Sequence, residues 1–125
     1  MDTGKSALGL DGNVAAALGY PIGIIAIISL IMEKENRFVK FHAIQSIVYH
    51  VAALVIFVGL VILITILSLM LAFARLGELS ALLWLLYMVV FLAYLAGLIY
   101  AAVKSYGGAE FKLPIVGNMA EKWTK

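Results

Sequence analysis

Four polar side chains at helical spacing carry the chemistry that stands out most in this sequence. They lie in the stretch MEKENRFVKFHAIQS, residues 32–46, and just beyond it, and they are His42, Gln45, Ser46 and Tyr49. At about 100° per residue they share roughly 100° of arc, so one helix would carry them as a polar stripe on an otherwise apolar surface. Two interpretations are open. The stripe contacts lipid headgroups, or it is an internal polar face that binds a partner or lines a wet groove.

Catalysis by these residues is not expected. The chain has no cysteine, and its two aspartates both lie within the first eleven residues. His42 and His50 have no neighbouring pair of carboxylates, which makes them a poor ligand set for a metal ion. No nucleophile, base and orienting residue can be grouped from the motifs, and Gly107-Gly108 lacks the lysine and hydroxyl of a phosphate-binding loop. We therefore expect a protein that is not an enzyme, with no catalytic residue, no metal ion and no cofactor.

The elements that carry the polar stripe have to be membrane helices. Of the 125 residues, 65% are hydrophobic and 13% are charged, and the mean hydropathy is +1.09. A soluble domain carries about a quarter charged residues to solvate its surface, so most of this surface must face lipid. The net charge of +2 is too small to indicate nucleic-acid binding. The predicted fold class is an all-α integral membrane protein, with residues 1–125 in a single membrane domain.

Three uncharged runs predict three transmembrane helices, over about 13–32, 47–72 and 79–103. Each run is long enough for the roughly 30 Å hydrocarbon core at about 1.5 Å per residue. Pro21 predicts a kink or a break in the first span. The second run is longer than a membrane requires. We therefore expect a polar interfacial segment at about 37–50 before this span, which either bends or continues as a helix that projects from the membrane.

A short C-terminal amphipathic helix is predicted at about 114–124. Pro114 suits the first turn of a helix, and Ile115, Met119 and Trp123 fall on one face of it. This segment would lie on the membrane surface, and a frayed tail is the alternative. A tail that dips into the bilayer, or a first span broken into a hairpin at its proline, would change the number of crossings from three.

The distribution of lysine and arginine predicts the face of the membrane that each loop occupies. Most of these residues fall in the loop after the first run and in the tail: Lys34, Arg37, Lys40, Lys104, Lys112, Lys122 and Lys125. The other two, Lys5 and Arg75, fall on the opposite face of a three-span arrangement. The positive-inside rule then places loop 33–43 and the C-terminus in the cytoplasm, or in the corresponding compartment of an organelle, and the N-terminus outside.

Three stretches of the sequence resemble a known family. NVAAALGY at 13–20, EKENRFVKFHAIQS at 33–46 and FKLPIVGNMAEKW at 111–123 resemble small prokaryotic membrane proteins related to the Tic-twenty component of chloroplast inner-envelope import. The order of first span, charged turn, apolar hairpin and Leu-Pro-x-x-Gly tail is similar as well. The plastid relatives have four spans and take part in preprotein translocation. This chain is shorter and shows no plastid transit segment, so the import function is not carried over. The resemblance to the prokaryotic members implies a chain integral to the plasma membrane of a prokaryote.

The resemblance and the polar stripe together give a set of candidate partner or polar-groove residues. These are Arg37, Phe41, His42, Gln45, Ser46, Tyr49, Leu113, Pro114 and Gly117. No catalytic role comes with the family. We expect a non-catalytic multi-pass membrane protein, a subunit or scaffold of a membrane assembly related to protein or peptide translocation. The alternative is an oligomeric channel or transporter for small solutes or ions. The expected partners are the lipid bilayer and other membrane proteins or further copies of the chain, and no nucleic acid.

Overall fold

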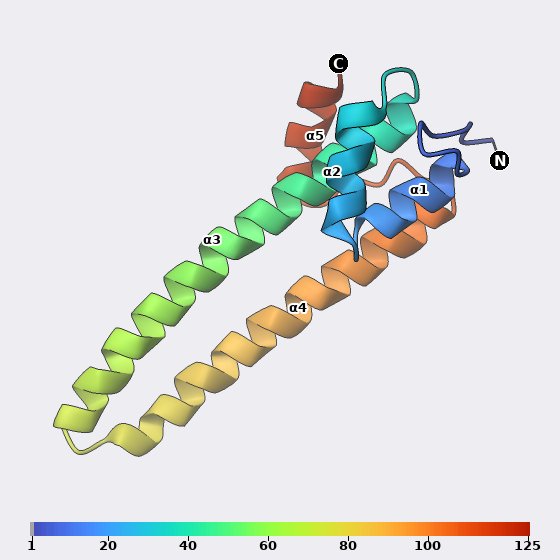
Figure 1. The fold of residues 1–125 in the computed structure, drawn as a ribbon. Helices are drawn as coiled ribbons and strands as arrows, with labels where there is room; N and C mark the ends of the chain where they lie inside the picture. Colours follow the sequence, from blue (N-terminus) through green and yellow to red (C-terminus); the bar gives the residue numbers. More distant parts are fainter. Residues whose placement is uncertain (1) are drawn as a thin grey trace. The chain divides into compact units, whose positions relative to one another are not determined.

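The computed structural model describes residues 2–125, which fold mainly into helices (Figure 1). The elements are α1 (Gly12–Gly19), α2 (Gly23–Met32), α3 (Arg37–Phe73), a 3-10 turn η1 (Gly77–Leu79), α4 (Ser80–Tyr106) and α5 (Val116–Thr124). In the described part of the chain the only β pairing is an isolated bridge between Lys5 and Asp11. The predicted all-α class is confirmed.

The first predicted span consists of two short helices. α1 ends at Gly19 and α2 begins at Gly23, with Pro21 in the turn between them. Proline has no backbone N–H and its ring clashes with the preceding turn, so a helix stops or kinks there. α2 has ten residues, which is about 15 Å of helix and only half of the hydrocarbon thickness. The predicted break is present, and the structure does not confirm a third membrane-spanning helix over 13–32.

α3 and α4 are the two helices long and apolar enough to cross a membrane within the described residues. In each helix, only 6% of the most apolar 18-residue window is buried inside the molecule. Helices of this composition whose side chains face outward require lipid as their solvent. The predicted span 47–72 lies within α3, and the predicted span 79–103 lies within α4 except for Leu79, which ends η1. The polar segment 37–50 and the second span form one continuous helix, α3, which begins at Arg37.

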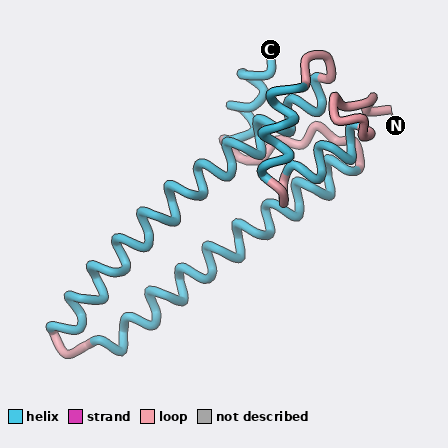
Figure 2. Tube along the Cα trace, in the orientation of Figure 1, coloured by secondary structure: helices cyan, strands magenta, loops and turns pink. Residues whose placement is uncertain are grey.

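The described chain forms two compact units. Unit 1 comprises the chain through Val51 together with Gly97–Lys125, and unit 2 comprises Ala52–Ala96. Each unit therefore contains part of α3 and part of α4. Within unit 2, the two helix segments form an antiparallel hairpin that is closed by a short loop (Figure 2).

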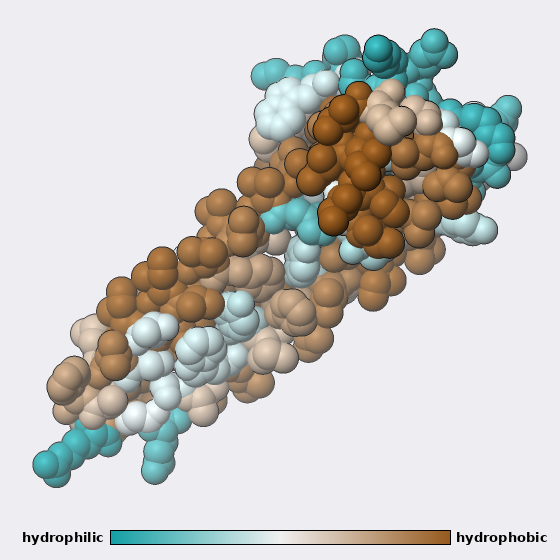
Figure 3. All heavy atoms as spheres, viewed as in Figure 1, coloured by the Kyte–Doolittle hydropathy of each residue, from teal (hydrophilic) through white to brown (hydrophobic). Residues whose placement is uncertain are grey.

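Apolar contacts hold unit 2 together. Phe57 of α3 packs edge-on against Tyr87 and Tyr94 of α4, with ring centroids 5.5 Å apart in both pairs. Such aromatic pairs add roughly 0.5–1.5 kcal/mol each beyond the area that they bury. Hydrophobic side chains cover much of the hairpin surface, and hydrophilic atoms gather at its turn (Figure 3). The charged residues of that turn are Arg75 and Glu78.

Unit 1 contains most of the buried side chains of the described chain. α1 and α2 pack closely, since a Cβ added to Gly19 would lie 3.4 Å from the Cβ of Ala26. An apolar cluster joins α2, α3 and α5, and it consists of Leu30, Phe41, Ile44, Val48 and Ala120. The charged loop and the C-terminal helix are thus parts of one folded unit.

The N-terminal segment is tied to the loop between α2 and α3. The Ala7 N–H donates to the buried carboxylate of Glu33 at 2.7 Å, and the side-chain amide of Asn36 donates to the Thr3 carbonyl at 2.8 Å. Segments joined by hydrogen bonds cannot lie on opposite faces of a membrane. The predicted position of the N-terminus, across the membrane from loop 33–43, therefore does not agree with these contacts.

Candidate functional site

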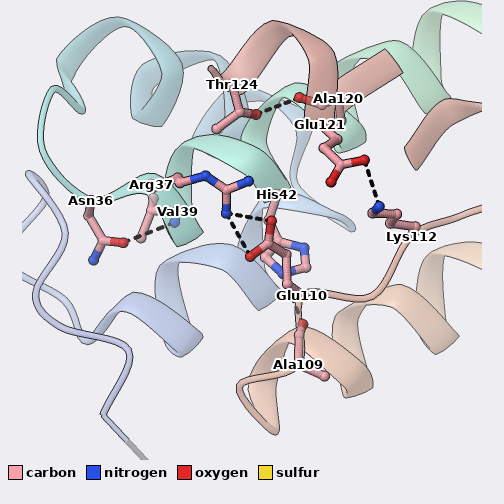
Figure 4. Close-up of polar contacts among 10 residues, drawn as sticks. All are labelled: Asn36, Arg37, Val39, His42, Ala109, Glu110, Lys112, Ala120, Glu121 and Thr124. Atoms are coloured by element: carbon pink, nitrogen blue, oxygen red, sulfur yellow. Dashed lines mark hydrogen bonds and ion pairs between the residues drawn. The ribbon is translucent and has the colours of Figure 1, made fainter. Parts of the chain in front are cut away.

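The polar stripe of α3 faces the C-terminal segment 109–113. We call Tyr20, His42, Gln45, Ser46 and segment 109–113 together the polar junction. His42, Gln45 and Ser46 are at most 1% exposed, and Tyr20 is fully buried. In this structure the partner of the stripe is the chain itself. Part of the polar junction and the ion pairs beside it are drawn in Figure 4.

Gln45 lies at the centre of the polar junction. Its Nε2 donates to the hydroxyl of Tyr20 at 2.7 Å and to the carbonyl of Phe111 at 2.8 Å. Its Oε1 accepts the backbone N–H of Leu113 at 2.9 Å. A side-chain amide has two N–H donors and a carbonyl acceptor. Gln45 can therefore satisfy both the Tyr20 hydroxyl, in the turn between α1 and α2, and backbone groups of segment 109–113. Because these groups are removed from water, each would be costly to leave without a partner.

His42 is a neutral ring with its hydrogen on Nε2. Nε2 lies 3.1 Å from the Ala109 carbonyl, which can only accept, so Nε2 donates (Figure 4). Nδ1 lies 2.7 Å from the hydroxyl of Tyr20. The Tyr20 oxygen already accepts from Gln45, so its own O–H donates to Nδ1. The hydrogen bonds of this network therefore all run in one direction, from Gln45 to Tyr20, from Tyr20 to His42 and from His42 to the Ala109 carbonyl. A second proton on the His42 ring would displace the Tyr20 O–H from Nδ1.

Ser46 extends the junction to α1. Its hydroxyl donates to the carbonyl of Gly19 at 2.6 Å, at the end of that helix. The last carbonyls of a helix have no partner within the helix and need one from outside. Ser46 thus stabilises the end of α1 where Pro21 interrupts the chain. Close by, Nδ1 of His50 donates to the Ser46 carbonyl at 2.7 Å.

Two ion pairs flank the polar junction at the surface of unit 1. Arg37 Nη1 contacts both carboxylate oxygens of Glu110, at 2.7 and 2.9 Å (Figure 4). Lys112 donates to Glu121 of α5 at 2.6 Å. This hydrogen bond, together with the charge of Lys112, holds the pKa of the Glu121 carboxyl below its ordinary value. Both pairs are exposed enough to be screened by solvent, so they contribute little compared with the buried network.

The Leu-Pro-x-x-Gly pattern of the tail has a geometric reason. Leu113 is buried, and its carbonyl accepts the N–H of Gly117 at 2.8 Å. A Cβ on Gly117 would lie 2.5 Å from the Cβ of Lys112 and 2.8 Å from Oε1 of Gln45. A glycine is therefore required for the tail to fold back against α3 at this point.

The C-terminal helix begins later than predicted. Pro114 is exposed and precedes α5, which starts at Val116. Between them Ile115 has a φ of 65°, outside the helical region, so the helix cannot extend back to the proline. α5 turns its small residues Gly117 and Ala120 inward. The large apolar side chains of Met119 and Trp123 in α5, and of Ile115 just before it, are exposed.

Comparison with known sequences identifies the family. Residues 7–120 match the MamF/MmsF family, described as a magnetosome magnetite crystal formation protein family. The chain belongs to the MamF/MmsF family. It is 42% identical over 132 residues to a UPF0132 membrane protein of Methanocaldococcus jannaschii, covering 98% of this chain and 96% of that protein. A UPF0132 membrane protein of Archaeoglobus fulgidus is 40% identical, with coverages of 88% and 92%. No solved structure matches.

Membership of the MamF/MmsF family supports part of what the sequence predicted. A second protein of M. jannaschii, also named a UPF0132 membrane protein, is 30% identical and covers 94% of this chain. These relatives and the two long apolar helices make the chain a small membrane protein. They support a relation to archaeal membrane proteins, and they give no support to a relation with Tic-twenty proteins.

The remaining candidate residues of this MamF/MmsF member lie outside the polar junction. Phe41 is fully buried in the apolar cluster of unit 1, and Arg37 lies at the surface. Tyr49 lies against α4, where its hydroxyl approaches Gly97 so closely that a Cβ there would overlap it. Sequence reasoning missed Tyr20, although this residue ends the stretch NVAAALGY. It also missed Glu110, because this residue lies 73 positions from Arg37 and no local pattern indicates that the two would pair.

Proposed function

We propose that the protein is a non-catalytic scaffold of a membrane assembly, with α3 and α4 as its membrane anchor and unit 1 as its folded polar part. One observation carries this proposal. The polar side chains that would be the candidates to bind a ligand or to react, His42, Gln45 and Ser46, are buried and hydrogen-bonded within the chain. They serve the fold of unit 1, which leaves the outer surface of that unit to contact partners.

The same contacts support a topology with two crossings. Asn13 of α1 donates to the carbonyl of Tyr106, the last residue of α4, at 2.8 Å. If only α3 and α4 cross, everything before α3 and after α4 lies on one face. That face would carry every lysine and arginine of the chain except Arg75. The positive-inside rule assigns this face to the cytoplasm, so the proposed topology has both termini inside.

An oligomeric channel is less well supported than a scaffold. The polar stripe was the candidate lining of such a pore. Its His42 and Gln45 are occupied by Tyr20 and by segment 109–113, and its Ser46 by the carbonyl of Gly19. The name of the matched family refers to magnetite crystal formation. Our proposal includes no mineral-binding role, because residues 2–125 hold no group of three or more His, Cys, Asp or Glu side chains placed to bind a metal ion.

Site-directed photo-crosslinking in native membranes tests the scaffold. The crosslinker replaces Lys34 or Lys122, both exposed in unit 1, and Arg75 in the hairpin turn serves as the matched control. We expect Lys34 and Lys122 to capture the same partner protein, and Arg75 not to capture it. The identity of that partner then decides the class of assembly, including the peptide translocation suggested by sequence resemblance. Purified protein that forms only a homo-oligomer and conducts ions in vesicles would contradict the proposal.

Labelling of single introduced cysteines tests the topology separately. The chain has no cysteine of its own, so each label reports one position. We expect positions 5, 34 and 122 to react from the cytoplasmic face and position 75 from the opposite face. Reaction of positions 5 and 75 from the same face would contradict the topology with two crossings and support the arrangement with three spans.

A further inference from the structure

We propose that unit 1 binds one anionic phospholipid in an apolar groove between α2, α3 and α5, with an acyl chain in the groove and the phosphate at Lys40. The groove has a volume of about 250 Å³. It is lined by Leu30, Lys40, Ile44, Ile47, Val48 and Trp123. This inference goes beyond the scaffold role and does not depend on which protein the scaffold binds.

The order of the lining residues along α3 matches the order of groups in a phospholipid. Lys40, Ile44, Ile47 and Val48 have the spacing i, i+4, i+7 and i+8, which places them on one face of a helix. From Lys40 to Val48 the helix rises about 12 Å. The cation comes first, near the polar start of α3, and the apolar positions follow towards the span. A lipid bound along this face would have its phosphate at Lys40 and its chain beside the isoleucines.

The groove has one positive charge, that of Lys40, and no negative charge within the lining to balance it. Lys40 is its only charged lining residue, and no aspartate or glutamate lines it. The ion pairs among the described residues use Lys5, Arg37 and Lys112, and Lys40 takes part in none of them. The cytoplasmic leaflet of a membrane carries anionic lipids that attract basic residues, and the proposed topology places Lys40 at this leaflet. An anionic headgroup is therefore the complement that this groove lacks.

The walls of the groove are fixed by the fold of unit 1. Ile44 belongs to the buried apolar cluster, and Leu30 and Val48 pack against that cluster. Trp123 adds an exposed indole from α5, and tryptophan is favoured where an apolar surface meets the headgroup region. The groove thus offers a shaped apolar surface with one cation and one interfacial aromatic, which suits a two-part ligand such as a phospholipid.

Quenching of Trp123 fluorescence by lipids with brominated acyl chains tests the proposal directly. The chain has two tryptophans, so Trp84→Phe leaves Trp123 as the reporter in the full-length protein. Brominated phosphatidylglycerol is compared with brominated phosphatidylcholine in vesicles. We expect half-maximal quenching at about a fivefold lower concentration of phosphatidylglycerol than of phosphatidylcholine. This is the factor in affinity that one lysine near a membrane surface supplies.

Three variants make the outcome specific. Lys40→Gln should abolish the preference for phosphatidylglycerol, whereas Lys122→Gln, a cation outside the groove, should keep it. Ile47→Trp fills the groove with a larger side chain and should reduce the amount of bound phosphatidylglycerol, which native mass spectrometry measures without the tryptophan signal. Equal quenching by the two lipids, or a preference that survives Lys40→Gln, would overturn the proposal. A co-purifying protein that shields Trp123 from both lipids would overturn it as well.

Discussion

The two units of this protein satisfy their polar groups in different ways. In unit 1 the side chain of Gln45 is fully buried and bonds to Tyr20, Phe111 and Leu113. In unit 2 the hydroxyl of Thr65 donates to the Val61 carbonyl, one turn earlier in the same helix. Hydrogen bonds within one helix fix no partner, whereas bonds between distant segments select one arrangement. Unit 1 is therefore specified by polar contacts, and unit 2 by apolar packing of two helices.

This difference also separates the tasks of the two units in our proposal. A hairpin whose exposed side chains are apolar can rest in lipid with few specific contacts. A unit with a buried polar network holds its surface groups in fixed positions, as a scaffold requires. Two tryptophans allow the comparison to be tested unit by unit, because Trp123 lies in unit 1 and Trp84 in unit 2.

Replacement of Gln45 should give the largest effect. Gln45→Met keeps the length of the side chain but leaves Tyr20, Phe111 and Leu113 without their partner. An unsatisfied buried polar group costs about 1–3 kcal/mol, so we expect a loss of about 3 kcal/mol or more in the free energy of unfolding. Denaturant titration in mild detergent, followed through Trp123 and separately through Trp84, measures this loss. The Trp123 transition should shift far more than the Trp84 transition.

Ser68→Ala is the matched control for Gln45→Met in unit 2. The Ser68 hydroxyl is buried and makes no hydrogen bond within the described residues. Removing it should leave stability unchanged or slightly higher, because a desolvated hydroxyl without a partner is a cost to the folded state. A loss for Ser68→Ala as large as that for Gln45→Met would show that polar groups matter equally in both units.

Gly117→Ala should rank second. The added Cβ would overlap Lys112 and approach Gln45, so either the tail or α3 has to move. Overpacking of this kind costs about 1–3 kcal/mol, and we expect about 2 kcal/mol by the same titration. Gly59→Ala in unit 2 is the control, since no atom lies within 4 Å of a Cβ there. In a helix interior alanine is favoured over glycine, so Gly59→Ala should be neutral or stabilising.

The membrane helices and the break at Pro21 could be predicted from the sequence, because hydropathy and proline act locally. The division of 13–32 into helices of eight and ten residues could not, because hydropathy does not show where an apolar run separates into short helices. The start of α5 was also out of reach. Nothing in the residue type indicates that Ile115, which is β-branched, adopts a positive φ.

Of the polar junction, the sequence predicted the residues on α3 but not the groups that they bind. The spacing of His42, Gln45 and Ser46 gave the stripe correctly as one face of a helix. Most of its partners are backbone groups, among them the carbonyls of Ala109 and Phe111, and a backbone group has no signature in the sequence because every residue has a carbonyl. Gln45 and its tail partners are also 66 and 68 residues apart, a separation at which local patterns carry no information.

Tyr20→Phe should give an intermediate effect. It removes only the hydroxyl that accepts from Gln45 and donates to Nδ1 of His42. The ring keeps its packing, while Nδ1 loses its donor, so we expect a loss of about 1–2 kcal/mol. The signal of the His42 ring nitrogens in NMR should also shift, because Nδ1 no longer accepts a hydrogen bond. An unchanged ring signal would mean that the assigned direction of the network is wrong.

The smallest effect should come from the ion pair at the surface. Arg37 contacts both oxygens of Glu110, but the two side chains are 52% and 33% exposed, so water screens the pair. Arg37→Gln, Glu110→Gln and the double variant form a cycle whose coupling we expect to be below about 1 kcal/mol. The coupling should fall further at high salt, because the Debye length shortens. A coupling as large as the effect of Gln45→Met would show that unit 1 is held by charge at its surface, and the contrast between the two units would then rest on electrostatics instead of buried hydrogen bonds.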